Sequence, residues 1–322
     1  MRVLLTGNLG YIGPVVTAAL KRAGHEVMGL DTGWFLPNLA APPEWPEEQV
    51  FGDIREDGLF LSADAIVHLA GLSNDPMGAL NESLTERVNL DGTLNLIASH
   101  PDIRHVIVSS CSVYGAAEMA TEETPVAPQT AYATAKAAVD YYVQRRNLRG
   151  LNAVSLRLGT VYGWSPGMRL DLVVNRMTYD ATHGLGITVT GNAARPLTHI
   201  EDVASAIVFM LDRPETGVFN VVGENWRMRD LAETIAWATK AKIREQDTGS
   251  GDARDYMASA AKLEALGWQS EWGVGDALAD LLRAGHILGL GSPFRYERLH
   301  ALKDLIRSGY LDSDLRHERI AA

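Results

Sequence analysis

The amino-acid sequence predicts an α/β fold: a doubly wound parallel sheet with a smaller C-terminal lobe. Short apolar runs typical of buried parallel strands alternate with stretches of helical periodicity through the first half of the chain. A glycine-rich turn joins the first apolar run to the first helical stretch, directly at the N-terminus. With 322 residues, the chain is long enough for one large α/β domain that carries a smaller lobe.

The turn near the N-terminus has the glycine spacing of a phosphate-binding loop. An apolar run at 3–5 predicts a strand, and Gly7, Gly10 and Gly13 follow it before a helical stretch that lasts to residue 24. Gly7 permits a tight strand-to-helix turn, and Gly10 lets the backbone approach a pyrophosphate. Gly13 lets the helix pack closely on the strand, so that the positive N-terminus of the helix faces the phosphates.

An acidic residue ends the second predicted strand. The apolar run at 27–30 leads into Asp31, whose carboxylate would accept hydrogen bonds from ribose hydroxyls and repel a 2′-phosphate. A glycine triplet alone is common in turns, but its place between a strand and a helix, followed by this acid, is typical of dinucleotide binding. The sequence therefore predicts a Rossmann-type domain that prefers NAD to NADP.

The same alternation of strands and helices continues to about residue 160. Helical stretches carry apolar positions between 84 and 97, ending before Pro101, and again from 131 to 148, ending at Gly150. Further strands are expected at 49–52, 65–71, 106–110 and 153–157. Strands separated by helices in this way predict a parallel sheet.

Beyond Tyr162 the elements become shorter, and glycine, proline and tryptophan interrupt them. Two later segments, 187–189 and 218–222, still have strand composition. We therefore expect a Rossmann domain over 1–162 whose sheet is completed by segments within 187–222. Residues 163–293 then form mainly the smaller lobe, and 294–322 form a charged, amphipathic tail that predicts a pair of surface helices.

Composition excludes several classes of function. A net charge of −11 argues against a nucleic-acid partner, which needs a basic face. No apolar stretch approaches the roughly 20 residues of a membrane span, and nothing resembles a signal peptide, so a cytoplasmic protein without a membrane partner is expected. Cys111 is the one cysteine, and the nine histidines show no ligand spacing, so no disulfide and no metal site are predicted.

Catalytic groups are suggested by two segments that follow one another along the chain. Tyr132 and Lys136 are four residues apart at the start of a predicted helix, so they share one face. A lysine beside a phenol lowers the phenol pKa and makes it a usable acid or base. Ser110 stands at the carboxyl end of a predicted strand, where ligands bind in open parallel sheets. Each feature alone is commonly structural, but their combination indicates a catalytic site.

These segments, taken in order, resemble the extended short-chain dehydrogenase/reductase family, in particular its nucleotide-sugar epimerases and dehydratases. The match runs from residue 2 to about 282, so it covers most of the chain. Besides the glycine-rich turn and the Tyr132-x-x-x-Lys136 pair, the matching pieces are Asp53-Ile54, His68-Leu69-Ala70-Gly71, Asn89, Ser109-Ser110, Val113-Tyr114-Gly115, Leu156-Arg157, Val161-Tyr162-Gly163 and the segment Arg195 to Val203.

The resemblance implies bound NAD, a nucleoside-diphosphate sugar as substrate held by the C-terminal lobe, and a homodimer. Tyr132 would be the catalytic acid/base, Ser110 its partner at the substrate oxygen, and Lys136 the contact to the nicotinamide ribose. The cofactor residues would be Gly7, Gly10, Tyr11, Ile12, Gly13, Asp31, Asp53, Ile54, Leu69, Ala70, Gly71, Tyr132, Lys136 and Leu158. The substrate residues would be Ser73, Asn89, Ser112, Thr160, Arg195 and Arg254.

Departures from the family pattern narrow the expected reaction. The 4,6-dehydratases of the family carry Asp and Glu directly after the catalytic Ser or Thr, where this chain has Cys111 and Ser112. What stays intact supports hydride transfer at carbon 4, so an epimerase that works through a transient keto-sugar is expected. A keto-sugar reductase, a dehydratase that uses other acids and a non-catalytic NAD-binding sensor remain as alternatives. The segment 73–75 either faces the sugar ring or forms an Asx-type turn. Arg254 either reaches the diphosphate or lies on the surface.

Overall fold

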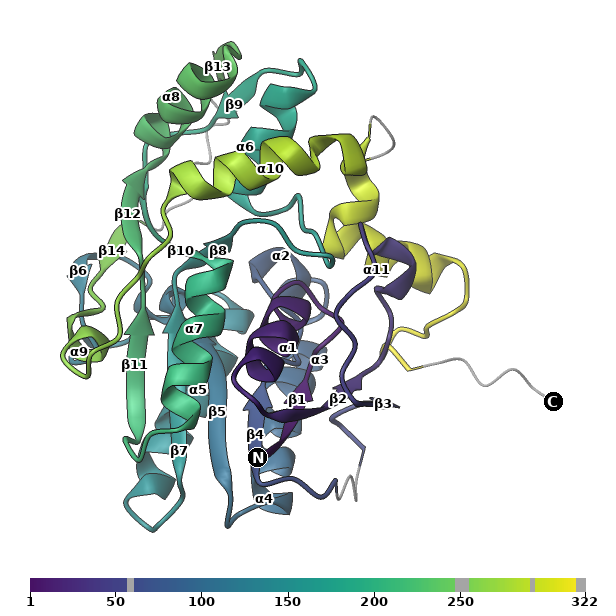
Figure 1. Cartoon of the computed structure of the whole chain (residues 1–322), viewed down its shortest axis with the longest axis vertical. Helices are drawn as coiled ribbons and strands as arrows, with labels where there is room; N and C mark the ends of the chain where they lie inside the picture. Colours follow the sequence, from purple (N-terminus) through teal and green to yellow (C-terminus); the bar gives the residue numbers. More distant parts are fainter. Residues whose placement is uncertain (57–60, 247–254, 290–292, 317–322) are drawn as a thin grey trace.

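A seven-stranded, entirely parallel sheet forms the centre of the molecule (Figure 1). The computed structural model describes residues 1–56, 61–246, 255–289 and 293–316. The strand order is β11-β7-β5-β4-β1-β2-β3. The chain adds β2 and β3 on one side of β1 and then continues with β4 on the other side, so the order of the strands reverses between β1 and β4. In such a sheet, ligands bind in the crevice at the carboxyl ends of the strands at this point. The strands are β1 (Arg2–Thr6), β2 (Glu26–Asp31), β3 (Glu48–Phe51), β4 (Ala65–His68), β5 (Arg104–Ser110), β7 (Ala153–Leu158) and β11 (Gly217–Val221). The predicted fold class is confirmed.

Helices cover both faces of this sheet, as its apolar strands require. On one face lie α1 (Gly13–Arg22) and α7 (Ile200–Leu211), which pack against each other (Figure 1). The other face carries α3 (Glu82–Glu86), α4 (Gly92–Ser99) and α5 (Ala131–Asn147). The single helix expected at 84–97 is interrupted by a π-helical turn at Arg87–Asp91, a feature often found at functional sites.

The smaller lobe is built from three small sheets and several helices. The sheets pair β8 (Thr160–Tyr162), β10 (Ala194–His199) and β12 (Glu224–Arg227); β9 (Ile187–Val189) and β13 (Ile243–Glu245); and β6 (Ala117–Ala120) and β14 (Tyr256–Ala258). The helices are α6 (Val173–Thr182), α8 (Met228–Thr239), α9 (Ala261–Glu264) and α10 (Val274–Leu288), while the short α2 (Asp75–Gly78) contacts α5 of the Rossmann domain. In Figure 1, α6, α8 and α10 lie above the carboxyl ends of the central strands.

One expectation about the central sheet is corrected. The segment at 217–221 joins it as β11, but Ile187–Val189 pairs with β13 in a separate two-stranded sheet. Ile187 and Val189 bury their side chains against α6 and α8, so the strand completes the lobe instead. The division of the chain at residues 162 and 293 stays a prediction.

The C-terminal tail also differs from the expected pair of surface helices. A short 3₁₀ turn (Pro293–Tyr296) leads into one helix, α11 (Arg298–Arg307). Leu302, Leu311 and Leu315 are buried, and they share a core cluster with residues of β1, β2 and the loops after β2 and β3. These leucines attach the tail to the Rossmann domain. A pair of helices lying on the surface would not bury such side chains.

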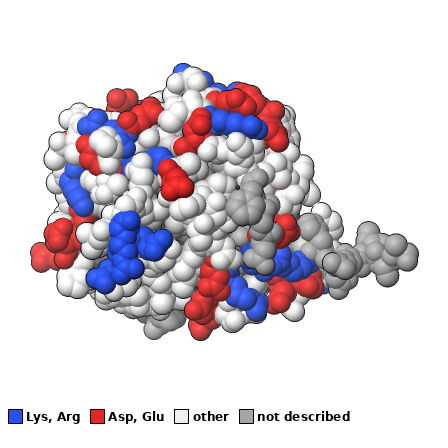
Figure 2. All heavy atoms as spheres, turned by 90° about the horizontal axis from the view of Figure 1, so that it is seen from below, with Lys and Arg blue, Asp and Glu red and all other residues white. Residues whose placement is uncertain are grey.

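Charged residues of both signs are interspersed over the face drawn in Figure 2, and neither sign forms a broad patch among its described residues. The exclusion of nucleic acid stays a prediction. Within the described ranges, no helix is long and apolar enough to cross a membrane.

Candidate active site

The glycine-rich turn has the shape that a dinucleotide diphosphate requires. Gly7 has φ +76°, and a Cβ there would lie 2.7 Å from the backbone nitrogen of Ala70, so the turn abuts the end of β4. A Cβ on Gly13 would lie 2.4 Å from the Asn8 carbonyl carbon. At the described N-terminus of α1, no side chain caps the helix and no acidic residue stands in the first turn. The uncapped end of the helix dipole is therefore available to an anion.

Asp31 is fixed by the loops on either side of it. Its Oδ2 accepts a hydrogen bond from the backbone nitrogen of Leu9 at 3.0 Å, and its Oδ1 accepts one from Gly33 at 2.8 Å. Burial raises the pKa of the Asp31 carboxyl, while these two hydrogen bonds oppose the shift. The acid is thus preorganised beside the glycine-rich turn, in the place where an adenosine ribose is expected.

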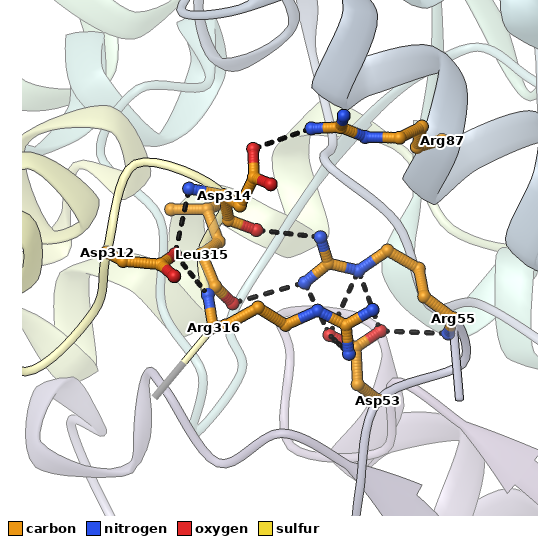
Figure 3. Close-up of polar contacts among 7 residues, drawn as sticks. All are labelled: Asp53, Arg55, Arg87, Asp312, Asp314, Leu315 and Arg316. Carbon is orange, nitrogen blue, oxygen red and sulfur yellow. Dashed lines mark hydrogen bonds and ion pairs between the residues drawn. The ribbon is translucent and has the colours of Figure 1, made fainter. Parts of the chain in front are cut away.

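Asp53 and Ile54, two of the expected cofactor residues, follow β3, and the Asp53 carboxylate is bound by arginines. Its carboxylate accepts three hydrogen bonds from the Arg55 side chain, at 2.5, 3.0 and 3.0 Å, and lies 3.6 Å from the Arg316 guanidinium (Figure 3). Burial would raise the pKa of Asp53, but its hydrogen bonds with Arg55 outweigh burial and hold that pKa below its usual value. Ile54 is buried in the core cluster that the tail completes.

Contacts with Thr6 and Asn89 order the segment after β4. The backbone nitrogens of Leu69 and Ala70 donate to Thr6, at its carbonyl and its hydroxyl respectively. Gly71 and the following turn lie beside Asn89, whose amide both accepts from and donates to the Leu72 backbone, at 2.8 and 2.9 Å. The buried amide of Asn89 thus holds this loop in place, and its expected contact with substrate stays a prediction.

Tyr11 contributes differently from what the family resemblance implies. Its hydroxyl donates to the Gly163 carbonyl at 2.7 Å and accepts from Asn175 at 3.0 Å. Ser165 donates to the Tyr11 carbonyl at 2.6 Å. Tyr11 therefore ties the glycine-rich turn to the loop between β8 and α6. Ile12 directly precedes α1.

The three predicted catalytic side chains come from adjacent elements. Ser110 ends β5, and Tyr132 and Lys136 lie in the first two turns of α5, whose N-terminus is capped by the Thr130 hydroxyl. The Ser110 hydroxyl accepts from the backbone nitrogen of Ser112 at 3.1 Å and forms a hydrogen bond with the Tyr132 side chain. The structure thus brings Ser110 and Tyr132 into direct contact at the carboxyl edge of the sheet.

Burial dominates the titration of both Tyr132 and Lys136. It raises the pKa of Tyr132 to about 12, against the hydrogen bond with Ser110, which lowers it. It lowers the pKa of Lys136 to about 8. The Lys136 ammonium donates to the Val108 carbonyl at 2.8 Å and lies 6.0 Å from the centre of the Tyr132 ring. Both groups are shifted toward their neutral forms.

A buried ion pair beside these residues was not found from the sequence. Arg169 is 5% exposed and donates to both oxygens of Asp171, at 2.8 and 2.9 Å, and to the Ser73 hydroxyl at 2.8 Å. Asn74 donates to Asp171 at 3.0 Å. The Arg169 charge also lowers the pKa of Tyr132. The pair therefore joins the Ser73 loop to the site, although no local motif marks an arginine 96 residues away.

The two residues that replace the dehydratase acids are unlike each other. Cys111 is fully buried, its thiol donates to the Arg157 carbonyl at 3.3 Å, and burial raises its pKa well above the usual range. The Ser112 hydroxyl is buried and has no hydrogen-bond partner among the described residues. Leu158, expected at the cofactor, pairs with Ser110 in the β5–β7 register and is buried in the core.

Two of the remaining predicted substrate residues, Thr160 and Arg195, lie in the smaller lobe. Thr160 begins β8, opposite Leu197 of β10. Arg195 lies in β10 with its guanidinium 5.6 Å from the centre of the Tyr256 ring. Arg254 lies outside the described residues. Among the described residues, no group of three or more His, Cys, Asp or Glu side chains could hold a metal ion.

A phosphate-binding turn, a preorganised acid and a contacting Ser–Tyr pair at one sheet edge define a Rossmann-type, NAD-dependent enzyme. Residues 3–222 match the NAD dependent epimerase/dehydratase family, and the chain belongs to that family. The NAD dependence of the family agrees with the fit of the turn and of Asp31 to the cofactor.

Known relatives support the family but differ in their activities. The chain is 28% identical over 294 residues to the low-salt glycan biosynthesis protein Agl12 of Haloferax volcanii, covering 84% of this chain and 94% of that protein. It is 30% identical over 239 residues to UDP-glucuronate 4-epimerase 3 of Arabidopsis thaliana, covering 66% and 55%. The Thermus thermophilus UDP-glucose 4-epimerase, solved with NAD, superposes with a TM-score of 0.72 at 26% identity, covering 89% and 99%.

Proposed function

We propose that this enzyme inverts the configuration at carbon 4 of a nucleoside-diphosphate sugar through a transient keto-sugar. The observation that carries the proposal is the Ser110–Tyr132 contact next to a Cys111 that is buried and held on a backbone carbonyl. The site therefore has the groups for proton transfer at one hydroxyl. It lacks, in the two positions after Ser110, the acids that elimination would need.

Tyr132 would move the proton of the reacting hydroxyl. NAD, when bound, supplies the capacity to accept a hydride from carbon 4 and to return it. A pKa of about 12 means that the free enzyme holds Tyr132 as the neutral phenol, and nearby positive charge is needed to make it a base. Arg169 and Lys136 are the cations placed to do this. Ser110 would hold the same oxygen by a hydrogen bond.

The cofactor would be held at its diphosphate by the turn from Gly7 to Gly13 and at its adenosine ribose by Asp31. Lys136 would hold the nicotinamide ribose. Ser73 and Ser112 would contact the sugar, and Thr160 and Arg195 remain proposed contacts to the nucleotide.

The enzyme would act as a cytoplasmic homodimer. A groove between α4 and α5 is lined by apolar and aromatic side chains and, on α5 and just after it, by arginines, and Tyr141 is 66% exposed; the lining residues are Leu90, Leu94, Ala138, Tyr141, Tyr142, Arg145, Arg146 and Arg149. An exposed aromatic beside apolar side chains is typical of a surface that a second copy covers. A particle of monomer mass in light scattering at micromolar concentration would contradict this part of the proposal.

The reaction can be tested on UDP-glucose and UDP-glucuronic acid, with products identified by NMR. The proposal predicts the 4-epimer without added NAD, because the hydride returns to the same sugar. A requirement for stoichiometric NADH would favour the reductase. A 4-keto-6-deoxy or decarboxylated product would favour elimination or decarboxylation. No turnover of any nucleotide sugar, with NAD bound, would favour a sensor.

A further inference from the structure

The C-terminal tail carries a buried arginine beside the predicted cofactor site. Arg298, the first residue of α11, is 3% exposed. One guanidinium nitrogen, Nη2, donates to the Gly167 carbonyl at 2.8 Å, and the guanidinium carbon lies 4.2 Å from the centre of the Phe35 ring. The other nitrogen, Nη1, is buried and has no hydrogen-bond partner among the described residues. A buried, unsatisfied donor on a cation is costly unless a ligand completes it.

The position of Gly167 places this guanidinium next to the glycine-rich turn. A Cβ on Gly167 would lie 2.0 Å from the carbonyl oxygen of Gly10, so the two backbones are in direct contact. Gly10 is the residue at which the backbone is expected to approach the dinucleotide diphosphate. Arg298 therefore bonds to Gly167 of the β8–α6 loop, and Gly167 in turn contacts the glycine-rich turn.

The charged groups around Arg298 leave it a cation whose Nη1 no neighbouring acid binds. Burial lowers the pKa of Arg298 to about 9, and Arg169 adds to this shift, while Asp171 and Asp31 oppose it. The side chain thus remains a cation at neutral pH. Asp171 is already bonded to Arg169 and Asn74, and Asp31 to two backbone nitrogens, so neither acid is bonded to Arg298 Nη1.

The tail is anchored at a second place, so the position of Arg298 does not depend on one contact. Arg55 donates to the carbonyls of Asp314 and Leu315, at 2.7 and 3.1 Å, and Arg87 donates to the Asp314 carboxylate at 2.7 Å (Figure 3). Leu302 is fully buried between these anchors and Arg298. The helix that bears Arg298 is thereby fixed to the loop after β3 and to the π-helical turn.

We propose that Arg298 binds the diphosphate of NAD, so that the C-terminal tail forms one wall of the cofactor site. The guanidinium would supply a charged donor to a phosphate oxygen, in addition to the N-terminus of α1. The proposal concerns cofactor binding and is independent of the reaction that the enzyme carries out on the sugar.

Calorimetric titration of the full-length protein, freed of NAD, tests this with three probes: NAD, ADP and adenosine. Arg298→Gln should raise the Kd of NAD and of ADP about 10- to 100-fold, the loss of one charge-assisted hydrogen bond, and change that of adenosine less than twofold. Arg307→Gln is the matched control, because Arg307 lies on the same helix, is 74% exposed and pairs with Asp304. Its affinities should match those of the wild type.

Arg298→Lys keeps the charge without the planar guanidinium. Its Kd values for NAD and ADP should fall between those of the wild type and those of Arg298→Gln. It also serves if Arg298→Gln does not fold. Unchanged affinity for NAD and ADP in a folded Arg298 variant would overturn the proposal. An equal loss for all three probes would overturn it too, because that result assigns Arg298 to the shape of the adenosine pocket.

Discussion

Replacing Lys136 by methionine removes a buried positive charge from the neighbourhood of Tyr132 while keeping a side chain of similar length. The ammonium lies 6.0 Å from the centre of the Tyr132 ring. A charge pair at that separation interacts by about 3 kcal/mol at an effective dielectric constant of about 20. This is equivalent to a pKa difference of about two units. Lys136 carries its charge below about pH 8, so in that range its removal should make the phenolate form of Tyr132 less favourable.

The consequence should be visible in the pH dependence of kcat. The acidic limb reports ionisation of the base, so in Lys136→Met it should move one to two pH units higher. Burial lowers the pKa of Lys136 to about 8, so wild-type Lys136 is charged below that pH and neutral above it. The gap between the two profiles should therefore be widest below pH 8 and narrow at higher pH.

The assay is initial rates of 4-epimer formation between pH 5.5 and 9.5 at saturating sugar. Lys262→Met is the matched control, because Lys262 also donates to a backbone carbonyl, that of Val218, but lies on α9. Its profile should coincide with that of the wild type. A Lys136→Met profile that keeps its position, whatever its height, would refute the idea that this lysine sets the acidity of Tyr132.

Three further outcomes follow from the site and its support. Tyr132→Phe keeps the ring and removes the ionisable hydroxyl, so turnover should fall about 10²- to 10⁴-fold while calorimetry finds sugar affinity unchanged. Cys111→Ala should leave kcat within about threefold, since the thiol is bonded away from the sugar; a large loss in a folded variant would indicate proton transfer at a neighbouring carbon. Asp140→Asn breaks a buried pair with Arg157 at 2.7 Å, so denaturant melts should show a stability loss of about 3–5 kcal/mol.

Those parts of the fold and site that depend on local sequence were predictable. The glycine spacing, the acid at the end of β2 and the i, i+4 spacing on α5 each specify geometry within a few residues. The Ser110–Tyr132 contact was also within reach, because consecutive βα units of a parallel sheet bring strand ends and helix starts together.

Contacts between distant segments were not predictable in this way. The hydrogen bond of Arg169 to Ser73 joins residues 96 apart, and Arg298 reaches Gly167 across 131 residues. Each arginine alone has the appearance of an ordinary loop or surface residue, and only contacts between distant segments bury it. The contact of Asn89 with the Leu72 backbone was unpredictable for a related reason: it is determined by the loop conformation and not by a motif.

The most direct test of the proposed 4-epimerisation is the fate of deuterium placed at carbon 4 of the UDP-sugar that proves to be the substrate. With catalytic amounts of the enzyme as purified and no added cofactor, the account predicts that the 4-epimer forms and that the deuterium stays at carbon 4. Epimer that has exchanged this deuterium for solvent hydrogen, or a product formed only by loss of water or carbon dioxide, would contradict it.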